Sequence, residues 1–131
     1  MKLVHNGTDW SLVNGNKTIL SQKIGKPVIY VGCGQENVYM YRGNFKIEDY
    51  VIERRPLAAL VVKVDENGAE IDFGGEMTMV IRLDGDLAQL SFTNVNPAIN
   101  RFWFRVDAKE TEHCYGCGEQ MSYFNLRGRH F

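Results

Sequence analysis

Residues 77–92 read MTMVIRLDGDLAQLSF, and this pattern predicts a β-hairpin. Before the turn, apolar side chains alternate with polar ones, apart from Val80, so they share one face of an extended strand. Those side chains are Met77, Met79, Ile81 and Leu83. Asp84-Gly85 is a dipeptide favoured in two-residue hairpin turns, and a second apolar run follows it. The stretch therefore favours antiparallel β-structure with one buried face.

The same turn chemistry recurs along the chain. Asn14-Gly15 and Asn67-Gly68 each lie between two runs of strand-forming residues. Further extended segments are expected at 27–31, 38–41, 45–47 and 101–106. The stretches expected to be loops are 32–37 and 41–44, and the one candidate helical turn is 47–53, before Pro56. We therefore predict an all-β fold of about nine to eleven short antiparallel strands, a β-sandwich in preference to a closed barrel.

Composition and charge limit the classes of partner. The chain has 131 residues, 44% of them hydrophobic and 24% charged, which is typical of one globular domain spanning residues 1–131. Its formal net charge of -1 argues against nucleic acid and against a polybasic membrane surface. No apolar run approaches the roughly 20 residues that span a bilayer, and residues 1–10 lack the apolar centre of a signal peptide. Three cysteines, an odd number, favour reduced thiols and a cytoplasmic location.

The densest group of chemically capable side chains lies between His113 and Phe131, which reads HCYGCGEQMSYFNLRGRHF. Cys114 and Cys117 form a C-x-x-C motif, which can serve as a redox pair or as half of a zinc site. The neighbouring glycines are poor helix formers, whereas a redox pair usually lowers its thiol pKa at a helix N-terminus. Zinc would need two further ligands, and Cys33 and the histidines supply no second spaced pair. We therefore expect ordinary thiols, no bound metal and no cofactor.

Acidic and aromatic side chains give two further clues to function. Glycoside hydrolysis usually needs two carboxyl groups about 5 to 10 Å apart, and Glu119 has no evident partner. Aromatic residues in a sandwich pack in the core more often than they bind a sugar. Trp103 is the exception, because it alternates with Phe102 and Phe104 and faces outward if those two lie in the core. We therefore take Trp103 as a candidate for a domain interface or a ligand contact.

Residues 115–119, YGCGE, resemble the Y-G-x-G-E signature of glycoside hydrolase family thirty-one, whose members are retaining α-glycosidases. The likeness extends over residues 115–129, YGCGEQMSYFNLRGR, which resemble the sulfoquinovosidase branch of that family. Two upstream stretches, YRGNF at 41–45 and NRFW at 100–103, also resemble that branch. In the family this signature lies at the end of an N-terminal β-sandwich, just before the catalytic barrel.

The resemblance implies a galactose-mutarotase-like supersandwich and catalytic aspartates on a (β/α)₈ barrel that this chain does not contain. It therefore carries over no catalytic residue, and we expect the chain alone to be inactive. The implied role is an accessory domain that packs on the barrel of the same polypeptide and helps to wall the pocket for an α-glycoside substrate. The residues that it carries over as pocket-loop candidates are Gly116, Gly118, Glu119, Gln120, Tyr123 and Arg127.

Two other functions stay open. The first is a stand-alone carbohydrate-binding module that uses Trp103 and the C-terminal aromatic residues. The second, which the residues favour less, is a thiol or metal-binding domain centred on Cys114 and Cys117. A domain separated from its barrel would also expose the face that meets it, through Trp103 or parts of 119–131. Exposed apolar patches favour association, so we expect a homodimer of the fragment.

Overall fold

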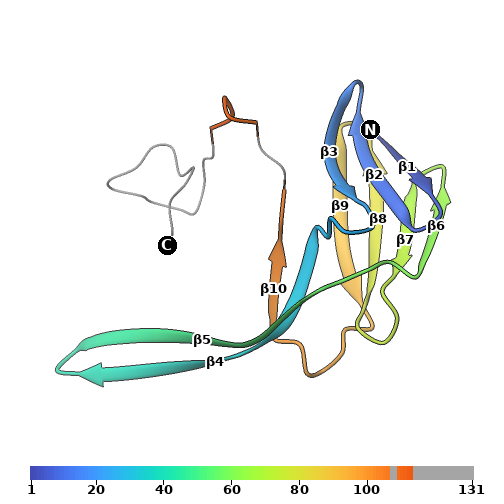
Figure 1. The fold of residues 1–131 in the computed structure, drawn as a ribbon. Helices are drawn as coiled ribbons and strands as arrows, with labels where there is room; N and C mark the ends of the chain where they lie inside the picture. The colour runs from blue at the N-terminus through green and yellow to red at the C-terminus, as the bar shows by residue number, and fades with distance from the viewer. Residues whose placement is uncertain (107–108, 114–131) are drawn as a thin grey trace.

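The computed structural model describes residues 1–106 and 109–113, which form ten β-strands and contain no helix (Figure 1). The strands are β1 (Lys2–Asn6), β2 (Asp9–Asn14), β3 (Lys17–Gln22), β4 (Ile29–Tyr41), β5 (Asn44–Pro56), β6 (Val61–Asp65), β7 (Gly68–Asp72), β8 (Thr78–Asp84), β9 (Leu87–Thr93) and β10 (Arg101–Phe104). Every strand pairing is antiparallel, so the predicted all-β antiparallel sandwich is confirmed. Within the same residues, nothing helical reaches the length and apolar character that a membrane span requires.

Two of the three sheets form the layers of the sandwich. One has the order β1-β2-β3 and the other the order β6-β7-β8-β9, and the two overlap in the view of Figure 1. Trp10 of β2 is 1% exposed and packs in one core cluster with Ile71 of β7 and Met79 and Ile81 of β8. The alternating face predicted for residues 77–83 is therefore the buried face of β8, with Leu83 packed at its margin.

The three predicted hairpins are all present, although the middle turn is Glu66-Asn67 and not the predicted Asn67-Gly68, because Gly68 begins β7. Pairing of Asn14 with Lys17, Asp65 with Gly68, and Asp84 with Leu87 leaves two-residue loops between the strands. Two glycines in these loops have positive φ, 56° at Gly15 and 54° at Gly85. This left-handed conformation carries little cost for a residue without a Cβ atom, which explains the turn dipeptides.

The third sheet, β10-β4-β5, corrects two local predictions. Its strands β4 and β5 are each 13 residues long, so the predicted loop at 32–37 and the predicted helical turn at 47–53 are both wrong. Gly32 and Gly34 permit close approach of β5 instead of making a turn. A Cβ atom on Gly32 would lie 1.8 Å from the backbone oxygen of Glu53, and one on Gly34 would lie 2.8 Å from that of Tyr50. The predicted loop at 41–44 does contain a tight turn.

The β4–β5 pair begins in the core and then leaves the sandwich. Ile29 and Val31 at the start of β4 are fully buried, and the backbone N–H of Leu57 donates to the carbonyl of Ile29 over 2.9 Å. A register shift between Cys33 and Gly34 marks a β-bulge, a feature that bends and twists a strand. Beyond it the two strands project away from the sandwich as an arm (Figure 1). We call residues 34–51 the projecting hairpin.

Candidate functional site

Most of the predicted site residues cannot be placed. Cys114 and Cys117 and the pocket-loop candidates lie outside the described residues, so their roles stay predictions; those candidates are Gly116, Gly118, Glu119, Gln120, Tyr123 and Arg127. Among residues 1–106 and 109–113, no three His, Cys, Asp or Glu side chains are grouped as a metal ion would need. Cys33, in this described part, is a free, half-buried thiol.

Trp103 lies in β10, opposite Tyr30 of β4, and is half-buried. The guanidinium carbon of Arg54 lies 5.0 Å from the Trp103 ring centroid and 4.7 Å from that of Tyr30, a cation–π arrangement with both rings. The prediction that Trp103 faces outward holds on the condition that Phe102 and Phe104 lie in the core. That condition is not met, because they are 37% and 44% exposed on a short strand at the sheet edge. The interface role of Trp103 stays a prediction.

The base of the projecting hairpin is fixed to β10 and the residue before it. The guanidinium Nε of Arg101 donates to both carboxylate oxygens of Asp49, over 3.1 and 3.2 Å, and its Nη2 also contacts that carboxylate. The hydrogen bond from Arg101 lowers the pKa of Asp49. Asn100 binds the backbone of Gly34 at two points, accepting from its N–H over 2.8 Å and donating to its carbonyl over 3.0 Å. These contacts set the direction in which the hairpin leaves the sandwich.

The tip of the projecting hairpin is a two-residue turn between Tyr41 and Asn44. Its central residues, Arg42 and Gly43, have φ values of 49° and 79°, both in the left-handed region that such turns require. Arginine is an uncommon residue in that conformation, and its guanidinium carbon lies 5.1 Å from the centroid of the Tyr41 ring.

One side of the projecting hairpin is apolar near its tip. Directly opposed residues of an antiparallel pair lie on the same side, and the register pairs Val38 with Ile47 and Met40 with Phe45. All four side chains are exposed, by 56%, 52%, 78% and 69% in that order. We call these four residues the apolar face. Nearer the sandwich the same side carries Asp49, which Arg101 covers.

The other side of the projecting hairpin is polar and bonded within itself. Tyr39 pairs with Lys46, and further along the strand Glu48 accepts hydrogen bonds from Lys46 and Tyr50. Lys46, then Tyr50 and Tyr39, lower the pKa of Glu48 through these hydrogen bonds. The same carboxylate raises the pKa of Tyr50. We call this side the polar face; it also carries Tyr41 at the tip.

Sequence reasoning missed the projecting hairpin as a site, although its signal is present. Val38 and Met40 alternate with polar or tyrosine residues before Arg42-Gly43, and Phe45 and Ile47 alternate after it. A two-residue turn at 42–43 places these four residues on one side. The predicted loop at 32–37 divided β4 into two short segments, so neither its 13-residue length nor its continuity with the core could be predicted.

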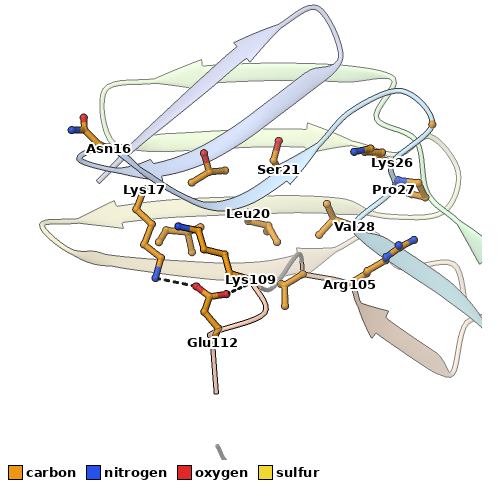
Figure 2. Close-up of a pocket in the computed structure, with 14 residues that line it drawn as sticks. Asn16, Lys17, Leu20, Ser21, Lys26, Pro27, Val28, Arg105, Lys109 and Glu112 are labelled. Atoms are coloured by element: carbon orange, nitrogen blue, oxygen red, sulfur yellow. Dashed lines mark hydrogen bonds and ion pairs between the residues drawn. The ribbon is translucent and has the colours of Figure 1, made fainter. Parts of the chain in front are cut away.

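A basic cavity of about 680 Å³ lies between β3 and the residues that follow β10 (Figure 2). Lys17, Lys26, Arg105 and Lys109 line it, together with Glu112, and other described residues complete its wall. The Nζ atom of Lys17 lies 3.8 Å from Oε1 of Glu112, whose Oε2 accepts a hydrogen bond from the backbone N–H of Lys109 over 2.9 Å. Within the described lining, four cationic side chains accompany one carboxylate, so the cavity carries an excess of positive charge.

The chain is similar to sulfoquinovosidases over almost its whole length, although no protein-family model matches it. A sulfoquinovosidase of Agrobacterium fabrum is 44% identical over 122 residues, which are 93% of this chain and 18% of that protein. A sulfoquinovosidase of Escherichia coli is 34% identical over 133 residues, covering 96% of this chain and 19% of that protein. The solved structure of a GH31 family sulfoquinovosidase from E. rectale, in complex with an aza-sugar inhibitor, matches 98% of this chain and 19% of that one, with 49% identity and a TM-score of 0.89. The chain thus spans about one fifth of the length of these relatives.

Proposed function

We propose, on the premise that this chain is a fragment of a glycoside hydrolase of family GH31, that the whole protein hydrolyses sulfoquinovosides. The observation that carries the proposal is the match of 98% of the chain, at 49% identity, to a sulfoquinovosidase solved with an aza-sugar inhibitor. Two further relatives with the same name support it. A cytoplasmic location and a galactose-mutarotase-like topology also belong to this proposal; the odd cysteine count supports the first and the antiparallel sandwich supports the second.

Within that enzyme, we assign the chain the role of an accessory domain that supplies no catalytic carboxyl group. A glycosidase general acid must keep its proton near neutral pH, which requires a raised pKa. In the projecting hairpin the opposite holds, because Lys46 lowers the pKa of Glu48 and Arg101 lowers that of Asp49. Glu76, near the sandwich, is engaged by Arg55 over 2.6 Å. These acids serve as structural partners of cations.

The accessory domain is proposed to pack on a catalytic barrel of the same polypeptide and to help wall its substrate pocket. Two parts of the chain support this role. The pocket-loop candidates between Gly116 and Arg127 carry the family signature, and the projecting hairpin extends away from the sandwich, so it can reach a second domain (Figure 1). Near the base of that hairpin, the rings of Trp103 and Tyr30 both contact Arg54, and this aromatic pair is a further candidate contact for a second domain.

The test is hydrolysis of nitrophenyl α-sulfoquinovoside and nitrophenyl α-glucoside by the full-length protein and by residues 1–131 alone. We expect the full-length protein to prefer the sulfoquinovoside and the chain alone to release no nitrophenol. Preference for the glucoside would overturn the substrate, and turnover by the chain alone would overturn the accessory role. Calorimetric titration of the chain with both sugars separates this role from a carbohydrate-binding module, which would bind at millimolar concentration or more tightly.

A further inference from the structure

We propose that the apolar face of the projecting hairpin is a docking surface that the remaining part of the same polypeptide covers. The inference rests on the proposed function to the extent that the covering part is taken to be the catalytic domain. Beyond the proposed function, the inference specifies that the apolar face is buried and that the polar face remains exposed to water. The four residues concerned are Val38, Met40, Phe45 and Ile47.

The apolar face is too exposed and too uniform to be ordinary surface. Isolated apolar side chains are common on protein surfaces, but a contiguous apolar group marks an interaction site. Here the two opposed pairs Val38–Ile47 and Met40–Phe45 form one unbroken group, with every member more than half exposed. The opposite side at the same distance along the strands carries Lys46 and Glu48 together with Tyr39 and Tyr41, so the side chains without a polar group lie on one side only.

The hairpin also does not fold this group back onto the sandwich. A two-stranded ribbon is only marginally stable by itself in water. Arg101 and Asn100 instead hold its base through Asp49 and the backbone of Gly34, and Asp49 lies on the same side as the apolar face. The hairpin leaves the sandwich from this base (Figure 1), and the exposed fractions of the four apolar side chains show that the sandwich does not cover them.

The length of the relatives indicates what covers the apolar face. This chain spans 18% and 19% of the two curated sulfoquinovosidases and 19% of the solved one, so about four-fifths of such a polypeptide lies outside it. A covalently linked domain meets the hairpin at an effective concentration of about millimolar, which a second copy of the protein does not reach at ordinary concentrations. The linked domain therefore outcompetes a second copy of the protein for the apolar face.

The two faces provide a matched internal control. Phe45 on the apolar face and Tyr41 on the polar face are both aromatic, lie on either side of the same turn, and are 69% and 70% exposed. Both react with hydroxyl radicals, as does Met40. Any difference in their oxidation within the full-length protein therefore reports what covers one face and not the other.

The experiment is hydroxyl-radical footprinting of the full-length protein, read by mass spectrometry, with the unfolded protein as the reference for intrinsic reactivity. We expect oxidation of Phe45 and Met40 to fall to background while Tyr41 is still oxidised, at every protein concentration used. Equal oxidation of Phe45 and Tyr41 would overturn the proposal. Protection of Phe45 that disappears on dilution would also overturn it, in favour of a contact between two copies.

A pair of substitutions tests the same point by a second route. In the full-length protein, Phe45→Asp places a carboxylate in the covered surface, so we expect a loss of thermal stability that Tyr41→Asp does not produce. Equal stability of the two variants would contradict the docking surface. Neither readout depends on the substrate, so a protein that protects Phe45 yet leaves sulfoquinovosides intact would support this inference while refuting the proposed function.

Discussion

Asn100 and Gly34 are joined by two hydrogen bonds, in which the Asn100 amide accepts from the Gly34 N–H over 2.8 Å and donates to the Gly34 carbonyl over 3.0 Å. The Asn100 side chain thus satisfies the two backbone groups of Gly34 that a neighbouring strand would otherwise pair with. It does so directly after the β-bulge, where the projecting hairpin leaves the sandwich. The amide therefore fixes the junction between the two parts of the molecule.

Removal of this amide should loosen the junction. Asn100→Ala deletes both hydrogen bonds and should cost about 1–2 kcal/mol of local stability, because one hydrogen bond contributes a net of roughly 0.5–1.5 kcal/mol. Native-state hydrogen exchange at the Gly34 amide measures the loss. Asn100→Asp is the matched variant: it keeps the acceptor for the Gly34 N–H, so that amide should exchange more slowly than in the alanine variant. Unchanged exchange in Asn100→Ala would contradict the assignment.

The ion pair between Arg101 and Asp49 should contribute to acid sensitivity. Arg101 lowers the pKa of Asp49 in the folded state, so the carboxylate stabilises the fold fully above its unfolded pKa of about 3.9. That stability is lost as the pH falls through the lower folded pKa. Asp49→Asn should therefore show a weaker decline of thermal stability at acid pH than the wild type. The exposed Glu66→Gln serves as the control, and parallel curves for Asp49→Asn and wild type would refute the prediction.

The centre of the sandwich should be sensitive to small changes in volume. Ile81 is fully buried in β8, so Ile81→Ala leaves a cavity and should cost about 2–5 kcal/mol of unfolding free energy. Ile81→Val removes one methyl group and should cost about 0.5–1.5 kcal/mol. Denaturant unfolding gives both values. Leu87→Ala, at an exposed site on β9, should change stability by no more than about 0.5 kcal/mol.

The turn at the tip of the projecting hairpin offers a stabilising substitution. Arg42 occupies the left-handed region at a cost of about 1–2 kcal/mol, whereas asparagine followed by glycine is the preferred pair for such turns. Arg42→Asn should therefore slow hydrogen exchange in the hairpin amides. Gly43→Ala introduces a Cβ atom at φ 79° and should accelerate the same exchange. Effects of the same sign in the two variants would show that turn conformation does not control the hairpin.

Residues 1–131 expressed alone should self-associate through the apolar face. Sedimentation velocity should show a concentration-dependent dimer for the wild-type chain, because an uncovered apolar group favours association. Phe45→Asp should return the chain to a monomer, whereas Tyr41→Asp should leave the dimer intact. A monomer at all concentrations would count against the prediction, and a dimer in both variants would move the contact elsewhere, for example to Trp103.

Local turn chemistry explains why much of the sandwich could be predicted. The loops after Asn14, Asp65 and Asp84 depend on two or three residues with strong conformational preferences, and those preferences are visible in the sequence. The buried face of β8 was likewise visible, because alternation of apolar residues depends only on neighbours along the strand. Both features are local, so they do not require knowledge of the partner strand.

The long strands could not be predicted for the opposite reason. Gly32 and Gly34 look like turn residues, and only the proximity of Glu53 and Tyr50 shows that they permit close backbone contact. Residues 47–53 form a strand because β4 pairs with them along their length, which overrides a weak local helical preference. The candidate site depends on the same nonlocal pairing, since Met40 and Phe45 share a side only when β4 and β5 are in register.

The path of strand β4 has a consequence for the projecting hairpin. It runs without a loop from Ile29, fully buried, to Tyr41 at the tip, and 13 residues of extended chain measure about 40 Å. The direction of the tip is therefore set where the strand leaves the core and again at the β-bulge after Cys33. A change of backbone direction at either point moves Met40 together with the whole projecting hairpin. Repacking around Ile29 can thus misalign the distant tip while every residue at that tip remains unchanged.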